Sequence, residues 1–396
     1  MAQRDARDSR FAVVVLGAGP GGAAAAAELA RRGLRSALVG RRVDPRPNDP
    51  RPNVGECLPP GIRPQLEKAG VWESFLRAGH TPSAGIRSIW GGPEAADRDF
   101  IFSPYGAGWH IDRARFDAMM RNSAISCGAE WIDCQALRDV SQTPSGWRID
   151  LTTDDGERSL QGSVVIDATG RASAFARRIG VKRRMLDRLT GVAGYYSLDE
   201  SALPIDPVLL VEAVEDGWWY SAPLPGGRLI AVFLTDADYV QSERLTQTDR
   251  WTSRLQATVQ QRRRIQTYGG KLDGAVRILS AESSFLERIS GDGWLATGDA
   301  AAAFDPLSSQ GIVSAISSGL DAAQTTAAWI EGDDQAPAQY AQRTRGKYAE
   351  YLAHRQIYYG IERRWPASRF WRTRHAAPEA LSARVFPTRE PERVAL

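Results

Sequence analysis

Gly17-Ala18-Gly19-Pro20-Gly21-Gly22 lies between an apolar, β-branched run at residues 11–16 and a run at 23–32 that predicts a helix. The apolar run predicts a buried strand, and Gly33 is expected to end the helix. Residues 36–39 predict a second strand. This order of strand, glycine turn, helix and strand is the context that the dinucleotide-binding fingerprint requires.

The glycines of this turn have different expected roles. Gly17 permits the tight turn, Gly19 lets a pyrophosphate approach the backbone, and Gly22 lets the helix pack closely on the strand. The helix start would direct N–H groups and the positive dipole end at phosphates. We therefore expect the whole stretch to bind a nucleotide, namely Gly17, Ala18, Gly19, Pro20, Gly21 and Gly22. A glycine-rich turn in another α/β domain is the alternative.

The end of the second expected strand departs from this pattern. The acidic residue that usually binds the ribose is replaced by Gly40, which Arg41 and Arg42 follow. Arginines bind phosphates well through paired N–H groups. We expect Arg41 and Arg42 to reach a phosphate, and no ribose contact is predicted here.

Three later segments carry a family resemblance. They are WHIDRARFD at residues 109–117, VVIDATG at 164–170, and WLATGDAA at 294–301, which continues to FDPLSSQGI at 304–312. With the N-terminal glycines, they resemble the FAD-binding segments of the p-hydroxybenzoate hydroxylase superfamily. That group includes aromatic monooxygenases, geranylgeranyl reductases and flavin-dependent halogenases. The resemblance extends over most of residues 10–330.

The resemblance implies further FAD-binding residues. The pair Gly298-Asp299 matches the family's strand-end motif, whose carboxylate accepts a hydrogen bond from a ribityl hydroxyl. Gly311 and Ile312 match the helix start that faces the flavin pyrimidine and the phosphates. Arg113 matches the arginine of a helix near the cofactor. The alternatives are that Asp299 caps a helix starting at Ala300 and that Arg113 pairs with Asp117.

Two other segments separate the branches of the superfamily. VGECLPP at residues 54–60 resembles the "GE" loop of halogenases and related hydroxylases, and GWWYSAPL at 217–224 resembles the halogenase motif G-W-x-W-x-I-P. The lysine and the glutamate that halogenases need match Ser83 and Ser308, so the resemblance favours hydroxylation. The chain is most similar to flavoproteins that mature protein-derived quinone cofactors by oxidising a Trp or Tyr of a partner polypeptide.

The predicted architecture is α/β, with an FAD-binding Rossmann-like domain of the glutathione-reductase type, an antiparallel β-sheet substrate domain and a C-terminal helical segment. The FAD-binding domain is expected over residues 10–85, 105–185 and 280–332. The substrate domain is expected over 86–104 and 186–279, with strands at 86–90 and 100–102. The helical segment is expected over 333–396, either as a cap on the first domain or as a docking surface. A loop is expected at 44–52.

The resemblance implies an FAD-dependent monooxygenase. Reduced FAD would capture O2 as a C4a-hydroperoxide and hydroxylate an electron-rich aromatic ring, of a small molecule or of a partner polypeptide. No second glycine fingerprint follows residue 180, so no separate NAD(P)H domain is expected. The resemblance implies that NAD(P)H binds transiently or that a flavin reductase supplies the reduced flavin. The alternatives are a halogenase, an isoprenoid double-bond reductase and a flavin-binding maturation chaperone without turnover.

Catalytic candidates are few, because the flavin performs the chemistry. His110 is the acid–base candidate, since it lies beside the expected FAD-contacting helix and titrates near neutrality; a structural histidine is the alternative. Glu56 is expected to contact FAD or the substrate. Trp218 and Trp219 alternate along an expected strand, so at most one of them can line a cavity.

Composition excludes several other classes. A net charge of +3 does not indicate nucleic-acid binding, and the 3 cysteines and 4 histidines lack metal-ligand spacing. Residues 1–10 lack the apolar core of a signal peptide, and no apolar run is long enough to span a membrane. A cytoplasmic enzyme with no metal is expected.

Overall fold

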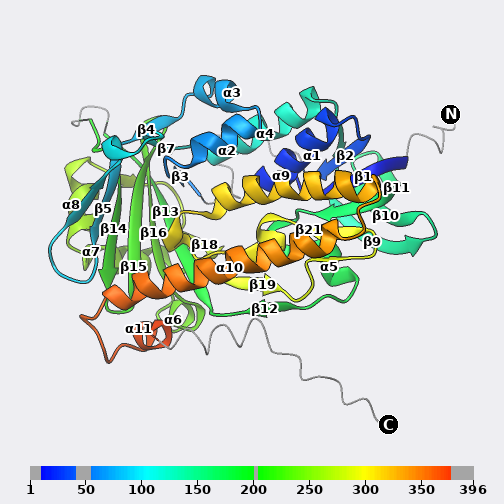
Figure 1. Cartoon of the computed structure of the whole chain (residues 1–396). Coiled ribbons are helices and arrows are strands. Elements are labelled where there is room, and N and C mark those ends of the chain that lie inside the picture. The colour runs from blue at the N-terminus through cyan, green and yellow to red at the C-terminus, as the bar shows by residue number, and fades with distance from the viewer. Residues whose placement is uncertain (1–9, 42–54, 200–203, 376–396) are drawn as a thin grey trace, which may run out of the picture.

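The computed structural model describes residues 10–41, 55–199 and 204–375, whose strands form two 8-stranded and two 3-stranded sheets (Figure 1). The expected loop at residues 44–52 and Arg42 lie outside these ranges. The α/β class is confirmed, with each large sheet forming the centre of one part of the molecule.

The first sheet has the parallel order β21-β11-β1-β2-β8 at its centre, and β9, β10 and β20 pair antiparallel at its margins. Val13, Val14 and Val15 of β1 have no exposed surface, because helices and neighbouring strands cover β1 completely. The strands of this sheet are β1 (Arg10–Leu16), β2 (Ser36–Gly40), β8 (Glu130–Asp133), β9 (Ala136–Thr143), β10 (Gly146–Thr153), β11 (Gly156–Asp167), β20 (Ser290–Gly291) and β21 (Trp294–Ala296).

The second sheet has the order β17-β13-β16-β15-β14-β5-β6, with β18 paired to β13. Its pairs are antiparallel apart from β14 and β5. Its strands are β5 (Gly85–Ile89), β6 (Ala96–Asp99), β13 (Leu189–Ser197), β14 (Val208–Val214), β15 (Gly217–Leu224), β16 (Arg228–Asp236), β17 (Lys271–Leu272) and β18 (Arg277–Ser280). The 3-stranded sheets consist of β3 (Cys57–Leu58), β4 (Thr81–Ser83) and β7 (Gly108–His110), and of β12 (Arg183–Met185), β19 (Ser284–Leu286) and β22 (Ala302–Ala303).

The helices cover the outer faces of both sheets, and α9 and α10 run side by side (Figure 1). They are α1 (Pro20–Arg31), α2 (Ile62–Lys68), α3 (Trp72–Arg77), α4 (Arg113–Ser126), α5 (Ala174–Arg178), α6 (Ala237–Ser242), α7 (Thr248–Gln256), α8 (Gln260–Thr267), α9 (Gly311–Ile330), α10 (Ala336–Ile361) and α11 (Arg369–Arg374). Short 3-10 turns are η1 (Phe100–Phe102), η2 (Gly170–Ala172), η3 (Gly298–Ala300) and η4 (Pro306–Ser308).

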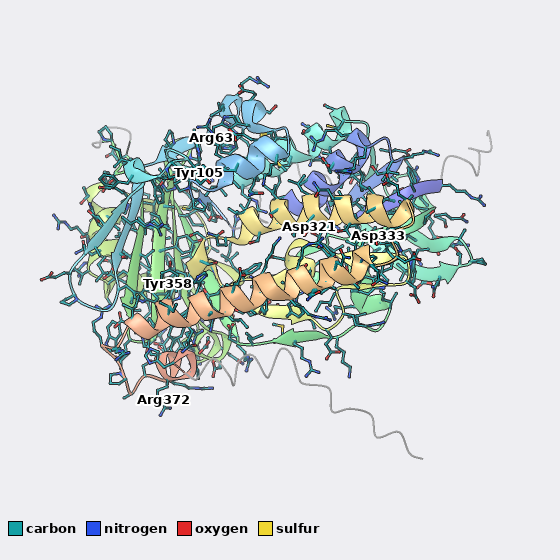
Figure 2. All side chains as sticks on the ribbon, in the orientation of Figure 1. Arg63, Tyr105, Asp321, Asp333, Tyr358 and Arg372 are labelled. Atoms are coloured by element: carbon teal, nitrogen blue, oxygen red, sulfur yellow. The ribbon has the colours of Figure 1, made fainter. Side chains whose placement is uncertain are left out.

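Helix α10 contributes to two hydrophobic cores, one at each large sheet. Tyr340, Tyr348 and Tyr351 belong to the core around the first sheet, while Tyr359 belongs to the core of the second sheet. The adjacent Tyr358, labelled in Figure 2, is 45% exposed on the outer side of the helix. The expected C-terminal helical segment is therefore present as a packed helix, and α10 covers more than the first sheet.

The stretch 186–279 contains helices α6, α7 and α8 as well as strands of the expected sheet. Two local predictions are wrong. Residues 100–102 form η1 and not a strand, since the Phe100 ring packs on Gly108, where an added Cβ would lie 2.6 Å from it. Helix α1 begins at Pro20 and not at residue 23, because proline is favoured in the first turn.

Candidate functional site

A cavity of about 1320 Å³ has walls from both large sheets. Most of the residues singled out in the sequence line it: Gly17, Ala18, Gly19, Pro20, Gly21, Arg41, Glu56, Arg113, Gly298, Asp299, Gly311 and Ile312. Gly22 and His110 are not among the lining residues. The fold therefore brings four separate sequence motifs to one cavity.

The glycine turn at the start of α1 leaves room at only some positions. Gly17 has a φ of +106°, and an added Cβ would lie 2.2 Å from the Ala168 oxygen. A Cβ on Gly22 would lie 1.8 Å from the Gly17 oxygen, so α1 packs directly on the turn. A Cβ on Gly19 would meet nothing within 4 Å, because this position faces open space. Gly19 is also the N-cap of α1, with no side-chain cap and no acidic residue in the first turn.

Charged groups also line the cavity. Arg41 donates to the Gln135 carbonyl oxygen at 2.8 Å, and Arg113 pairs with Asp117 at 2.9 Å. Asp299 lies in η3 and its carboxylate is 3.5 Å from the Arg171 guanidinium. Asp299 does not cap a helix, because η3 ends at Ala300 and strand β22 follows. The Arg113–Asp117 pair exists as the alternative predicted, and Arg113 nevertheless lines the cavity.

Glu56 is a buried carboxyl group in the cavity wall, 3% exposed. Its Oε2 accepts hydrogen bonds from the Gly55 N–H at 3.2 Å and the Tyr220 hydroxyl at 3.3 Å. Its Oε1 has no partner among the described residues. Burial raises the pKa of Glu56, and the hydrogen bonds and Arg113 only partly offset this rise.

His110 has no exposed surface and lies behind the cavity wall. Its Nε2 lies 3.2 Å from the Pro207 carbonyl oxygen and its Nδ1 lies 3.4 Å from the Cys57 sulfur. A carbonyl can only accept, so we assign the proton to Nε2, and Nδ1 then accepts from the thiol. Burial lowers the pKa of His110 to about 4. These contacts favour the structural histidine over the acid–base candidate.

One face of the second sheet lines the cavity with apolar and aromatic side chains. Along β15, Trp218 and Tyr220 line the cavity, whereas Trp219 points away and stacks on Phe233 at 4.8 Å. The prediction that at most one of the two tryptophans lines the cavity is confirmed. Leu224 of β15 also lines the cavity, as do side chains of the neighbouring strands, namely Tyr195, Leu209, Val211, Val232 and Leu234.

Residues 10–351 match the family described as the FAD binding domain. The chain belongs to this FAD-binding family. LodB of Marinomonas mediterranea, named as an FAD-dependent oxidoreductase, is 29% identical over 372 residues, which cover 92% of this chain and 97% of LodB. A tryptophan 2-halogenase of Chondromyces crocatus is 26% identical over 382 residues, which cover 93% of this chain and 71% of the halogenase.

Solved structures share the fold. The myxobacterial chondrochloren halogenase CndH aligns with a TM-score of 0.83 and 22% identity, covering 95% of this chain and 89% of CndH. QhpG, a peptidyl tryptophan dihydroxylase essential for tryptophylquinone cofactor biogenesis, aligns with a TM-score of 0.69 and 24% identity, covering 92% of this chain and 78% of QhpG. The resemblance to the superfamily of FAD monooxygenases and flavin-dependent halogenases is confirmed, and the protein is an FAD-dependent oxidoreductase.

The residues present fit FAD. The open space at Gly19 and the uncapped start of α1 suit a pyrophosphate, because backbone N–H groups and the helix dipole face it there. Towards the second sheet, the orphaned Oε1 of Glu56 offers a polar group to the flavin or to a substrate. Asp299 and Arg113 line the same cavity.

The sequence did not single out several residues that shape the site. Gly319 of α9 is one, since a Cβ there would lie 2.1 Å from the Gly21 oxygen of α1. Arg171, next to the motif at 164–170, lines the cavity and donates to the Phe304 carbonyl oxygen at 2.9 Å. Asp305, 1% exposed, accepts from Tyr359 at 2.7 Å and from Arg355 at 3.3 Å, which joins α10 to the cavity wall.

Two negative findings concern the described residues alone. No cluster of His, Cys, Asp or Glu side chains there has the arrangement of a metal site. None of the described helices has the length and apolarity needed to cross a bilayer.

Proposed function

We propose that the protein is an FAD-dependent monooxygenase that hydroxylates an electron-rich aromatic ring, and that this ring is a Trp or Tyr side chain of a partner polypeptide. NAD(P)H or a flavin reductase supplies the electrons, and O2 is the co-substrate. The proposal is supported by the family membership and by the apolar and aromatic side chains with which the second sheet lines the cavity.

The positions of the lysines favour hydroxylation over halogenation. A flavin-dependent halogenase is expected to need a lysine in its cavity to carry or orient the hypohalous species. The sequence has four lysines, all of them exposed and none of them in the cavity wall: Lys68, Lys182, Lys271 and Lys347. Ser83 and Ser308, which match the halogenase positions, cannot replace an ammonium group or a carboxylate.

The residues of this chain hold the ring and exclude water. FAD, when reduced, supplies the activation of O2. The apolar side chains of β13 to β16 give an aromatic ring a dry wall against the cofactor region. Oε2 of Glu56 already accepts two hydrogen bonds, so a proton on this carboxyl group lies on Oε1. Burial raises the pKa of Glu56, which favours the neutral carboxyl group beside Tyr220 in the cavity wall.

The polypeptide part of the proposal comes from the relatives. QhpG acts on peptidyl tryptophan, and LodB is similar over nearly the whole length of both chains. Halogenation is the second candidate, because a tryptophan 2-halogenase and CndH are also similar. The products separate the two reactions.

The test is a turnover experiment with labelled oxygen. The FAD-loaded protein is supplied with NADPH and a flavin reductase, with peptides that contain a single Trp or a single Tyr, and with bromide and chloride. We expect one or more labelled oxygen atoms from O2 in the peptide and no halogen. A halogenated peptide, or a peptide unchanged while NADPH and O2 are consumed, would contradict the proposal. Glu56→Gln should lower kcat for the same peptides while FAD remains bound.

A further inference from the structure

A cluster of Tyr195, Arg228 and Arg277 occupies the wall of the cavity on the second sheet. In β13, Ala193, Tyr195 and Ser197 share one face because side chains alternate along a strand. Arg277 of β18 lies opposite Ala193, and Arg228 of β16 lies opposite Ser197. The register therefore places one arginine on each side of Tyr195, from two different strands (Figure 1).

Both guanidinium groups contact the Tyr195 ring. The Cζ atoms of Arg277 and Arg228 lie 5.4 and 5.9 Å from the ring centroid, within the range of a cation–π contact. The Arg228 Nε is buried and has no hydrogen-bond partner among the described residues. Asp273 also lines the cavity, where it accepts two hydrogen bonds from Ser197, at 2.9 and 2.7 Å.

The position of Arg228 favours an anion beside it. A guanidinium that is partly removed from water loses hydration, and a facing anion offsets that loss. Arginine binds carboxylates and phosphates through two parallel N–H donors, and a Tyr ring beneath the guanidinium keeps its plane oriented. The neighbouring wall consists of the apolar and aromatic residues that suit a ring.

We propose that Tyr195, Arg228 and Arg277 form an anion-binding subsite that selects aromatic substrates carrying a carboxylate close to the ring. This inference rests on the proposed function, because it assigns the cavity wall to the substrate. On a polypeptide, the carboxylate is an acidic side chain or a chain terminus near the target Trp or Tyr. The same chemistry would suit a phosphate of a reduced pyridine nucleotide, so the test includes that ligand.

Calorimetric titration of the oxidised, FAD-loaded protein tests the subsite. The probes are indole-3-acetate, which carries a carboxylate, 3-methylindole, which has the same ring without charge, and NADPH. The native protein should bind indole-3-acetate more tightly than 3-methylindole. In Arg228→Gln and Arg277→Gln, the Kd for indole-3-acetate should rise roughly tenfold, whereas that for 3-methylindole should change by less than about twofold. Arg250→Gln, on the exposed surface of α7, is the matched control and should change neither.

Three results would overturn the subsite. The native protein could bind the two indoles equally, or the variants could lose affinity for both indoles equally, which would indicate a role in cavity shape. A loss of NADPH affinity with unchanged binding of indole-3-acetate would assign the arginines to the nucleotide. No oxygen or electron is transferred in the titration, so its outcome is independent of whether the ring is later hydroxylated.

Discussion

The glycine turn at residues 17–22 and the cavity-facing side of β13, β15 and β16 form the two ends of one site in different ways. The turn is built from six adjacent residues, and its chemistry comes from backbone groups and from absent side chains. The sheet face is assembled from strands that pair residues as distant in sequence as Leu189 and Asp236, and its chemistry comes from the side chains that the register brings together. Function at the glycine turn therefore depends on the room that the missing side chains leave. Function at the sheet face depends on which side chains are present.

The largest expected effect is that of Gly22→Ala, with Gly19→Ala as its matched control. A Cβ on Gly22 would overlap the Gly17 oxygen, so we expect a loss of at least about 3 kcal/mol in the free energy of unfolding, because overpacked sites cannot relax freely. Gly19→Ala should leave stability nearly unchanged, since its Cβ meets nothing, and should weaken FAD binding. Urea unfolding and flavin absorbance after gel filtration measure the two effects. Equal stability losses in both variants would refute this division of roles.

The buried His110 gives the next effect, which depends on pH. Its pKa in the folded protein, about 4, lies below the usual value of 6.5, so the unfolded chain binds more protons as the pH falls. Stability from this group is complete above pH 6.5 and is lost as the pH falls towards 4, by on the order of 3 kcal/mol. In His110→Gln this loss should disappear, while the loss from His80, whose pKa is also about 4, remains. Urea unfolding across this range measures the difference between the two proteins.

The outcome for His110 also tests its place relative to the site. If the histidine were an acid–base catalyst, His110→Gln would lower kcat strongly. A kcat within about twofold of the native value at pH 7.5, together with a flattened stability profile, is the structural result that the contacts with Pro207 and Cys57 favour.

The tryptophan pair of β15 separates the two faces of the second sheet. Trp219→Leu removes a ring that stacks on Phe233 and contacts Trp251, and should cost about 2–3 kcal/mol of stability. It should leave the affinity for 3-methylindole unchanged, because Trp219 faces away from the cavity. Trp218→Leu should weaken that affinity as well as stability, since Trp218 lines the cavity. Unchanged ligand affinity in Trp218→Leu would place the ring outside the substrate region.

Local patterns predicted much of the cofactor end of the site. The glycine turn, β1, α1 and the later motifs are contiguous segments whose residue types follow directly from backbone geometry, so each could be placed before the structure was known. The alternation of Trp218 and Trp219 was equally local. Arg42 and the loop at 44–52 lie outside the described residues, and their predictions stay open.

What the sequence did not predict depends on contacts between distant segments. The pairing of β13 with both β16 and β18 creates the arginine cluster, and neither arginine has a local signature. Helices α6 to α8 are short and polar, and each buries only one or two apolar side chains, namely Val240, Trp251, Leu255 and Ile265. The link between Tyr359 and Asp305 joins positions 54 residues apart.

The smallest expected effect is that of replacing Asp299. Unlike the glycine turn, this residue is expected to bind the cofactor through its side chain. Asp299→Ala should raise the FAD dissociation constant roughly tenfold, the equivalent of about 1.4 kcal/mol, if the carboxylate accepts a hydrogen bond from the cofactor. Its pair with Arg171 is long, at 3.5 Å, and partly exposed, so the pair itself should contribute little to stability. Asp299→Asn separates the two roles, because the amide oxygen still accepts a hydrogen bond but carries no charge. Recovery of FAD affinity in the Asn variant indicates a hydrogen bond to the cofactor, whereas equal losses in both variants would mean that the charge opposite Arg171 is what matters.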